Sequence, residues 1–523
     1  PEHRLRVIAP DVGGAFGAKN NAYPEELLAA ALALKLGCAV KWIEERQEHM
    51  LVTSHARAQT VDLTAGVDRD GRINALHFKL TADMGAYYHA ITPVGAMMTA
   101  MLMTGAYRIP HAKADIVSVF TNTTPTDPYR GFGRAEAAYF IERTMDLIAR
   151  ELALDPVQLR RRNFIQPEQF PFATPSGHVH ESGAYELCLQ RALAKLDYAK
   201  MRREQQLLRE QGRYLGIGIA THVWRAGFPS VPGGRGYVVG GWEKAIVSVD
   251  PGGKVRVVIG TSPHGQGIVT TTAQIVADTL GVPLTDIAVL HSDTDKVAQG
   301  NGTMGSRSLV VGGSAVLQAA QKVRDQALRL AAHMLRLEPA RLTLVAGRFR
   351  CIDDPAINIS FADVANRSFA GPVDLPPGMA SCLEAAVIFE ASNFVSCFGT
   401  HICVAEVEAD TARVKLLRYI AVDDAGRLIN PDIVEGQLHG GIVQGIGQAL
   451  MEEAVYDEMA QPLSSSFLDY AIPRAIDLPL IEVEITETPS TVNPLGARGI
   501  GEAGTVGAPP AVVNAVVDAL APF

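Results

Sequence analysis

Glycine-rich loops that follow an extended segment and precede a helix recur along this chain of 523 residues. The first loop, 13–17 (GGAFG), separates a strand predicted over 5–9 from a helix predicted over 24–36. The same order returns at the loop 261–267 (TSPHGQG), between a hairpin ending at 260 and a helix ending near 280. Small residues let backbone N–H groups approach a ligand closely, so each loop is a candidate anion or cofactor cradle.

Arg130 stands on a further loop of this kind, 128–133 (PYRGFG). A helix is predicted directly after it, because its apolar stripe recurs at helical spacing in Ile141, Met145, Ile148 and Leu152. Tyr129 and Phe132 place aromatic rings on both sides of the arginine, which is rare for an ordinary solvated arginine. We therefore expect Arg130 to bind an anion or an oxo group.

Turn and capping signals predict several other elements. Residues 60–83 alternate as strands around the turn 68–71 (DRDG), which indicates a hairpin. Asp155-Pro156 opens a helix, and the charged segment 200–213 reads as an exposed helix that leads to a domain boundary. The loop 300–308 (GNGTMGSRS) opens a helix predicted over 309–335, and its serines can cap exposed N–H groups or hold a phosphate.

Glu502 is the only ionisable side chain between Gly499 and Pro510, a stretch rich in glycine and alanine. A carboxylate presented by such a tightly turned backbone is typical of a general base. The alternative of a surface turn with a solvated glutamate stays open. A dinucleotide fingerprint is excluded, because Pro509 and Pro510 are expected to break the following helix and the chain ends before a ribose-binding acid.

A helix is also predicted from Pro431, with Asn430 as its N-cap. One of its faces is formed by amides and glycine, namely Gln437, Gly441, Gln444 and Gln448. This face favours either a polar ligand or a helix–helix contact at the glycines, and the sequence leaves both open. The methionine-rich run 97–103 fits core packing better than pocket lining.

Composition narrows the function classes. A net charge of -9 gives no reason to expect a nucleic acid partner, and the longest apolar stretches are too short for a membrane span. The six cysteines contain no C-x-x-C pair, so no zinc knuckle or iron–sulfur cluster is expected and a cytoplasmic protein is predicted. In a redox enzyme the electrons must then leave through another polypeptide. The start at Pro1 is expected to be a processed or truncated end.

Six ordered motifs together resemble the molybdenum-cofactor subunit of the xanthine oxidase family of molybdenum hydroxylases. The resemblance runs from about residue 5 to 520, and six motifs in order are far more specific than any one alone. The fourth motif is most similar to the bacterial branch that includes carbon monoxide dehydrogenase large subunits. The motifs are GGAFGAK (13–19), YRGFGR (129–134), HGQG (264–267), GTMGSRS (302–308), GQ (436–437) and GEAGTVGAPP (501–510).

The resemblance implies a hydroxylase that takes its oxygen from water and holds molybdenum through a pyranopterin dithiolene, with no direct protein ligand to the metal. In bacteria this cofactor is usually molybdopterin cytosine dinucleotide. By motif position Glu502 would be the catalytic base. The cofactor site would contain Phe16, Gly17, Arg130 and Gly305 around the metal, Gln266, Gly267 and Gln437 at the pterin, and Ser306 and Arg307 along the pyrophosphate.

Departures from the family pattern bear on the substrate. No cysteine follows Arg130, in the loop that carries the copper-binding cysteine of carbon monoxide dehydrogenases, so that enzyme is disfavoured. Asn20 and Met98 stand where purine oxidisers have a glutamate and an arginine. With Tyr129 and Phe132 they form a weakly polar candidate substrate pocket, which favours an aldehyde or an aromatic N-heterocycle. A purine dehydrogenase is the alternative.

The expected architecture is α+β, with two elongated cofactor-binding domains, 1–212 and 213–523, and the cofactor at their interface. Partner subunits would carry [2Fe–2S] clusters and FAD. The family's amino-terminal hammerhead region has no counterpart after Pro1, so a separate chain or a truncation is expected to account for it. A non-catalytic assembly half of a split molybdoenzyme is the second hypothesis.

Overall fold

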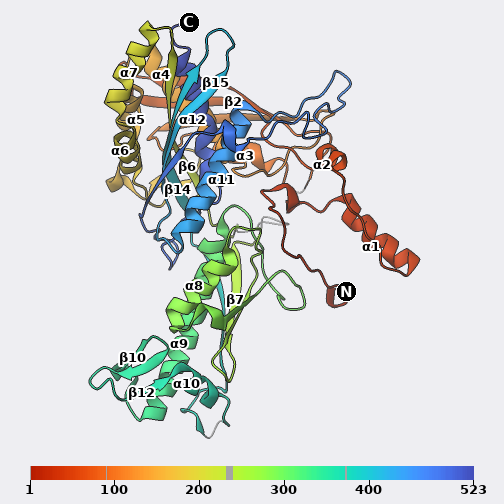
Figure 1. Ribbon diagram of the computed structural model, residues 1–523, viewed down its shortest axis with the longest axis vertical. Coiled ribbons are helices and arrows are strands. Elements are labelled where there is room, and N and C mark those ends of the chain that lie inside the picture. Colours follow the sequence, from red (N-terminus) through yellow and green to blue (C-terminus); the bar gives the residue numbers. More distant parts are fainter. Residues whose placement is uncertain (1, 90, 231–239, 372–373) are drawn as a thin grey trace.

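A computed structural model describes residues 2–89, 91–230, 240–371 and 374–523. Figure 1 shows a large upper body, a lower lobe made by the middle of the chain, and an amino-terminal segment that extends to one side. Helices and strands are mixed throughout, which confirms the predicted α+β class. Among the described residues, no helix combines the length and the apolar character needed to cross a bilayer.

The centre of the upper body is a four-stranded sheet in the order β16-β15-β14-β6. Strands β6, β14 and β15 pair antiparallel, whereas β15 and β16 are parallel. Almost every residue of β6 and β14 is buried, since helices cover both faces of the sheet. The strands are β6 (Tyr214–Ala226), β14 (Val395–Val407), β15 (Val414–Asp424) and β16 (Ile481–Thr486).

Two sets of helices cover this sheet. Ile141 of α4 and Leu189 of α6 belong to the apolar core on one side, and Ile442 of α11 and Val512 of α12 to the core on the other. The helices expected after Arg130, after Asp155 and over 200–213 are confirmed as α4, α5 and α7. The bounds are α4 (Arg134–Glu151), α5 (Pro156–Asn163), α6 (Tyr185–Leu196), α7 (Tyr198–Glu210), α11 (Pro431–Leu450) and α12 (Ala503–Ala519).

The predicted hairpin at 60–83 is confirmed and forms part of a three-stranded sheet beside the central one. β1 and β2 are antiparallel and β3 runs parallel to β2. The methionine run forms α3, in which Met98 is buried and Met97 is exposed. The elements are β1 (Gln59–Val67), β2 (Ile73–Asp83), α3 (Val94–Met101), β3 (His111–Val119), β4 (Phe172–Ala173) and β5 (Val179–His180).

The lower lobe is a four-stranded sheet, β13-β7-β8-β9, with α8 and α9 packed against it in one large apolar core. The predicted helices after the loops at 261–267 and 300–308 are α8 and α9, and a π-helical turn at Ser308–Gly313 precedes α9. The elements are β7 (Trp242–Val249), β8 (Val255–Ile259), α8 (Ile268–Leu280), β9 (Ile287–Leu290), α9 (Ser314–Leu335), β10 (Leu342–Val345), β11 (Arg348–Cys351), β12 (Asn358–Ser360), α10 (Phe361–Ser368) and β13 (Leu383–Glu390).

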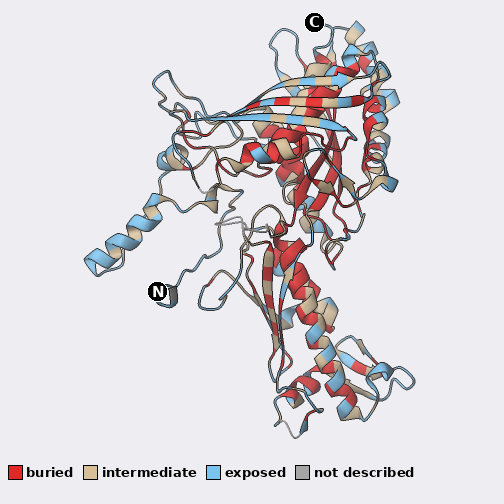
Figure 2. Cartoon of the chain, turned by 180° about the vertical axis from the view of Figure 1, so that it is seen from behind, coloured by how far each residue is buried: buried red, intermediate tan, exposed pale blue. Residues whose placement is uncertain are grey.

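The amino-terminal segment is exposed or only partly buried. The helix α1 (Pro24–Leu36) is confirmed with its predicted bounds, and Gly37 ends it in the left-handed conformation. α2 (Arg46–Val52) follows, and no residue from 3 to 52 is buried, as the pale colour in Figure 2 shows. The strand predicted over 5–9 is wrong: only an isolated bridge from Ile8 to Asp293 forms, because no neighbouring strand is available there.

Glycines allow α12 to lie directly on the central sheet. An added Cβ at Gly216 or Gly218 of β6 would overlap the carbonyl oxygens of Ala515 and Ala511. On the other side of the helix, a Cβ at Gly504 would lie 2.5 Å from the backbone nitrogen of Ile442 in α11. The carboxyl-terminal helix is therefore clamped between sheet and helix at backbone-to-backbone distance.

The expectation that Pro509 and Pro510 break this helix is wrong. Both lie inside α12, which continues to Ala519. Every residue from 503 to 512 is buried, so the packing on both sides offsets the missing N–H donors. Tertiary contact decides the conformation here, and local propensity does not.

The variant Gly218→Ala tests this clamp. The new methyl group would overlap the backbone of α12, which has no room to move, so we expect the free energy of unfolding to fall by about 3 kcal/mol. Urea denaturation followed by circular dichroism measures the change. Gly371→Ala is the control, because a Cβ at Gly371 meets no atom within 4 Å. Equal stability of the two variants would contradict the clamp.

Candidate active site

Glu502 is the residue immediately before α12, and its carboxylate faces two other loops. Oε1 accepts hydrogen bonds from the Gly131 backbone N–H at 3.1 Å and from Arg134 Nη1 at 3.0 Å. Oε2 accepts one from the hydroxyl of Ser306 at 3.1 Å. The side chain is 12% exposed, so the alternative of a solvated surface turn is wrong. Gly499 permits the approach, because a Cβ there would lie 2.7 Å from that of Ser306.

Arg130 is buried beside this carboxylate, and its guanidinium nitrogens donate hydrogen bonds to neutral oxygen atoms. Its Nε donates to the carbonyl of Gly501, Nη1 to Gln444 Oε1 at 3.1 Å, and Nη2 to the carbonyl of Gln437 at 2.9 Å. Burial lowers the pKa of the guanidinium, although the nearby Glu502 acts in the opposite direction. Arg130 thus ties the loop 128–133 to α11 and to the start of α12.

The glycines of the α11 face form the helix–helix contact that the sequence left open, and contact of its amides with a polar ligand stays a prediction. Gly441 forms the helix–helix contact, since a Cβ there would lie 3.0 Å from the Cα of Gly504. Gln437 and Gln444 bind Arg130, while Gln448 accepts a hydrogen bond from Arg57 at 3.0 Å. The glutamines therefore position arginines around the site.

The first glycine loop meets the arginine loop directly. Gly17 has a φ of 120°, and a side chain there would overlap the carbonyl of Pro128. Phe16, with a positive φ of 50°, places its ring 5.7 Å from the guanidinium carbon of Arg130. The structure thus brings Phe16 and Gly17 to the Arg130 side of the site, as predicted from the motif positions.

The loop 302–308 contributes residues to two different environments. Gly305 has a φ of 50°, and a side chain there would overlap the ring of Phe228. The next residue, Ser306, reaches Glu502. Arg307 turns inward instead: it is 1% exposed and binds the carboxylate of Glu243 at 2.7 Å. A role for Arg307 along a pyrophosphate stays a prediction.

The side chain of Gln266 forms hydrogen bonds within its own loop. Its Nε2 donates to the carbonyl of Ser262 at 3.0 Å, and its Oε1 accepts the backbone N–H of His264. Gly267, at a φ of 78°, packs against α11, where a Cβ would lie 2.5 Å from Ile433 Cδ1. The loop therefore lies beside the helix that carries Gln437, and its ligand role stays a prediction.

The four residues of the expected substrate pocket lie on the loops around Arg130 and on α3. Burial raises the pKa of Tyr129 to about 12, and Arg57 lies over its ring at 5.1 Å. Phe132 packs on Gly95, and Met98 packs on the loop at Gly133. Asn20 ends the turn Ala18–Asn20, where its backbone N–H bonds the carbonyl of Gly17. Their contact with a substrate stays a prediction.

Arg134 is the main functional residue that the sequence reasoning missed. It is 3% exposed and supplies the only ion pair that Glu502 makes among the described residues. Its presence in the motif YRGFGR was a local signal, because Arg134 is the first residue of the helix that follows the Arg130 loop.

A buried group of potential metal ligands, His222, His401 and Asp423, lies beneath α12. His401 bonds Asp423 at 2.9 Å and the hydroxyl of Tyr419 at 2.8 Å. Burial raises the pKa of Asp423, but the two histidines outweigh it and hold that pKa well below its usual range. A Cβ at Gly507 would lie 2.5 Å from His401 Nδ1, so this cluster supports the helix that carries Glu502.

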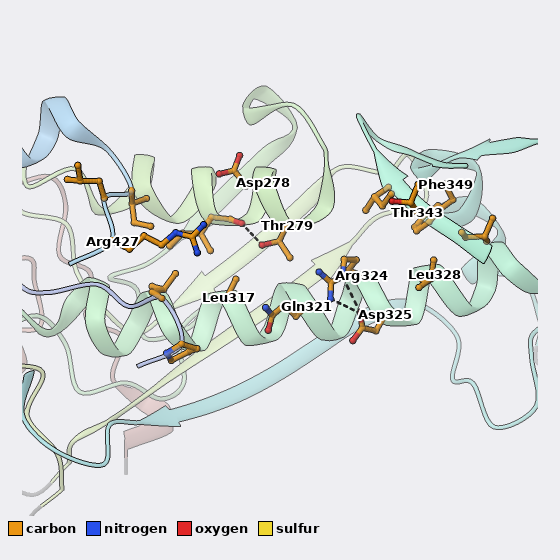
Figure 3. A pocket seen from close by; sticks show the side chains of 17 residues that line it. Asp278, Thr279, Leu317, Gln321, Arg324, Asp325, Leu328, Thr343, Phe349 and Arg427 are labelled. Atoms are coloured by element: carbon orange, nitrogen blue, oxygen red, sulfur yellow. Dashed lines mark hydrogen bonds and ion pairs between the residues drawn. The ribbon is translucent and has the colours of Figure 1, made fainter. Parts of the chain in front are cut away.

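A groove of about 630 Å³ lies elsewhere, in the lower lobe. Figure 3 shows Asp278 and Thr279 of α8, Gln321 and Arg324 of α9, and Arg427 along its walls. None of the predicted site residues lines this groove. The candidate active site is therefore the cluster of loops around Glu502.

Two family models with the description "molybdopterin cofactor-binding domain" match the chain, one over residues 191–479 and the other over residues 1–164. The chain belongs to the molybdopterin-cofactor-binding large subunits of the molybdenum hydroxylases. The resemblance carried by the six motifs is thereby confirmed. The two matches also confirm that the fold contains two cofactor-binding units.

Relatives agree with this membership over the whole chain. The carbon monoxide dehydrogenase large chain of Afipia carboxidovorans is 37% identical, with 100% of this chain and 65% of the relative covered. The nicotine 6-hydroxylase large subunit of Paenarthrobacter nicotinovorans is 36% identical, covering 100% and 64%. The crystal structure of quinoline 2-oxidoreductase from Pseudomonas putida 86 matches with a TM-score of 0.94 and 36% identity, covering 100% and 67%. The chain thus spans about two thirds of the length of these relatives.

The residues of this molybdopterin-binding subunit fit an anionic cofactor. The guanidinium of Arg130 has neutral oxygens as hydrogen-bond partners, and Nη2 of Arg134 is buried with no hydrogen-bond partner among the described residues. Gly265 and Gly302 have positive φ, and a Cβ at either would meet no atom within 4 Å. Exposed backbone on open glycine loops, together with buried guanidinium groups, matches the needs of a phosphate-bearing ligand.

The variant Glu502→Gln tests the base in the assembled enzyme. The amide keeps the shape of the side chain but cannot take a proton, and loss of general base catalysis costs on the order of 10²–10⁴ in rate. Steady-state turnover, normalised to molybdenum content, measures the effect. Glu458→Gln, at an exposed position, is the control. Turnover within a few-fold of the parent at full molybdenum content would remove Glu502 from the mechanism.

The variant Arg130→Lys tests the anchor. Lysine keeps the charge but cannot reach Gly501, Gln437 and Gln444 together, so we expect molybdenum occupancy or turnover to fall roughly tenfold or more. Metal analysis and turnover are measured on the same preparation. Arg191→Lys, in an exposed ion pair with Glu484, is the control. Normal loading and normal turnover would mean that Arg130 is only structural.

Proposed function

We propose that this chain is the molybdenum-binding subunit of a hydroxylase that oxidises an aldehyde or an aromatic N-heterocycle, with water as the source of oxygen. The observation that carries the proposal is the Glu502 carboxylate, which lies nearly buried where the loops of Arg130, Ser306 and α12 meet. A carboxylate in that position, surrounded by guanidinium groups, suits proton abstraction beside an anionic cofactor.

The two oxygens of Glu502 have different tasks. Arg134 and the Gly131 N–H both donate hydrogen bonds to Oε1, so its acceptor positions are taken. Oε2 has one donor, the Ser306 hydroxyl, which can rotate away or accept in turn. The proton therefore goes to Oε2. When bound, the molybdenum cofactor supplies the two-electron acceptor and activates the water.

The remaining residues position the cofactor and the substrate. Arg130, fixed by Gln437 and Gln444, presents a rigid cation to the cofactor side, and Phe16 shields it from one direction. Tyr129 and Phe132 offer aromatic surfaces next to this arginine, which suits stacking of a planar substrate. Together they exclude water from the carboxylate and hold the reacting carbon near it.

The relatives' names support the hydroxylase class, since they include nicotine 6-hydroxylase and quinoline 2-oxidoreductase. We further propose the cytosine dinucleotide form of the cofactor and partner subunits that carry [2Fe–2S] clusters and FAD. A separate chain that completes the subunit is part of the same proposal. The matched ranges 1–164 and 191–479 support two cofactor-binding domains, and the boundary at 212/213 and the cytoplasmic location stay predictions.

Two alternatives are less well supported. A non-catalytic assembly half has no physical need for Glu502 together with Ser306 and Arg134, a set that makes a complete proton-accepting site. A purine dehydrogenase needs charged groups, a glutamate and an arginine, where Asn20 and Met98 stand, and Met98 is a buried thioether. Oxidation of carbon monoxide is not proposed, because no cysteine follows Arg130 in its loop.

Purification of the native complex tests the proposal. We expect equimolar molybdenum, cytosine nucleotide released by acid, and dye-linked turnover of aldehydes or N-heterocycles with ¹⁸O incorporated from labelled water. Partner subunits should copurify and carry the iron–sulfur absorption. A complex without molybdenum would refute the hydroxylase. Higher kcat/KM for xanthine or hypoxanthine than for every aldehyde and simple N-heterocycle would refute the substrate class.

A further inference from the structure

Arg225, in strand β6, is a buried cation that forms no ion pair within the described residues. It is 6% exposed, and its two terminal nitrogens contact the sulfur atoms of Met101 and Met98. The guanidinium lies 4.1 Å from the ring centroid of Phe394, and Nε has no hydrogen-bond partner. Because thioether sulfur is a weak acceptor, the donors of this arginine are largely unused.

Among the described residues, three other buried arginines are neutralised by carboxylates. Each has a carboxylate within 3.0 Å, in the pairs Arg160–Glu142, Arg307–Glu243 and Arg498–Glu181. Burial and the charge of Arg134 lower the pKa of Arg225 to about 9, so it is still a cation at neutral pH. A buried charge without a partner is strongly destabilising, and such a group usually has a partner that binds later.

The rest of this chain does not offer that partner. The residues that the structure leaves undescribed are 1, 90, 231–239 and 372–373, and the sequence places no aspartate or glutamate among them. No described carboxylate therefore pairs with Arg225, and none of the undescribed residues carries one.

Arg225 adjoins the candidate active site. Its own carbonyl accepts a hydrogen bond at 3.1 Å from Nε of Arg134, whose Nη1 binds Glu502. Met98, which contacts Arg225, packs on Gly133 in the Arg130 loop. The backbone of Arg225 thus binds the arginine that pairs with Glu502, while its guanidinium contacts Met98 of the expected substrate pocket.

A chain of aromatic contacts connects Arg225 to Arg134. The ring of Phe394, which lies against Arg225, is 5.5 Å from that of Phe228. Phe228 in turn lies 5.5 Å from the guanidinium of Arg134 and against Gly305. A planar substrate has apolar faces to stack on here, a base at one end and an unpaired fork of donors at the other.

We propose that Arg225 binds a carboxylate on the substrate, so that the enzyme acts on an aromatic aldehyde or N-heterocycle that bears an acid group. The inference rests on the proposed hydroxylase function and narrows its substrate class. The planar guanidinium binds a carboxylate through two parallel hydrogen bonds, and the flexible side chains of Met98 and Met101 can withdraw to admit it. The bound carboxylate then supplies the missing counter-charge.

Matched substrates test the inference in the assembled, molybdenum-loaded complex. We compare 4-carboxybenzaldehyde with 4-methylbenzaldehyde, and pyridine-3-carboxylate with 3-methylpyridine. The parent enzyme is expected to prefer the acid in at least one pair by tenfold or more in kcat/KM. In Arg225→Met this preference is expected to fall roughly 10²-fold, mainly through KM of the acid, because the buried charge pair is lost. Arg225→Lys should retain part of it.

Arg213→Met is the control, because Arg213 is exposed and paired with Glu406. It should keep the preference of the parent. A parent enzyme that turns over the neutral member of both pairs as well as the acid, with no change in Arg225→Met, would overturn the inference. That result would leave the hydroxylase function intact.

Equilibrium binding separates the inference from the proposed function. Benzoate is not oxidised by such an enzyme, and it is expected to raise the thermal midpoint of the parent complex but not that of Arg225→Met. Without ligand, Arg225→Met is expected to unfold at a higher temperature than the parent, since a buried unpaired charge is removed. If benzoate binds in this pattern and no hydroxylation is found, the anion site stands and the proposed reaction fails. Equal benzoate shifts in both proteins would refute the site.

Discussion

The backbone-to-backbone contact of α12 with β6 and α11 determines where the Glu502 carboxylate can be. Gly216 and Gly218 bring the helix onto the sheet, and Gly441 and Gly504 bring it against α11. Glu502 precedes the first turn of this fixed helix, so its carboxylate is placed by buried packing and does not depend on a flexible loop. The loops of Arg130 and Ser306 then need only reach it with one hydrogen-bond donor each.

Charge balance is the second constraint on the site. Arg130, Arg134 and Arg225 are all buried near Glu502, which is one carboxylate among three guanidinium groups. Elsewhere in the fold, buried arginines such as Arg160 and Arg498 have carboxylate partners, so the excess of positive charge is local. Anionic ligands would restore the balance, and their binding would stabilise the folded subunit in proportion to their affinity.

Much of the fold and of the site could be predicted from the sequence, because local signals decided it. Pro24 begins α1 and Gly37 ends it, and the DRDG turn forms the first hairpin. Glu502 lies on a tightly turned backbone, as the glycines around it indicated. The predictions from sequence that were wrong or missing depend on tertiary contacts. Packing on two sides keeps Pro509 and Pro510 helical, and Glu243, far away in sequence, binds Arg307. No local pattern shows that Arg134 pairs with Glu502, since 368 residues separate them.

The two walls of the site differ in how firmly the rest of the protein holds them. Phe16 belongs to a segment in which no residue from 3 to 52 is buried, whereas Glu502 leads into a helix that is buried from 503 to 512. The free energy of local opening follows burial, so amide protons near Phe16 exchange with solvent long before those of α12. The wall of the site at Phe16 is thus expected to unfold locally at a lower free energy than the wall that carries the Glu502 carboxylate.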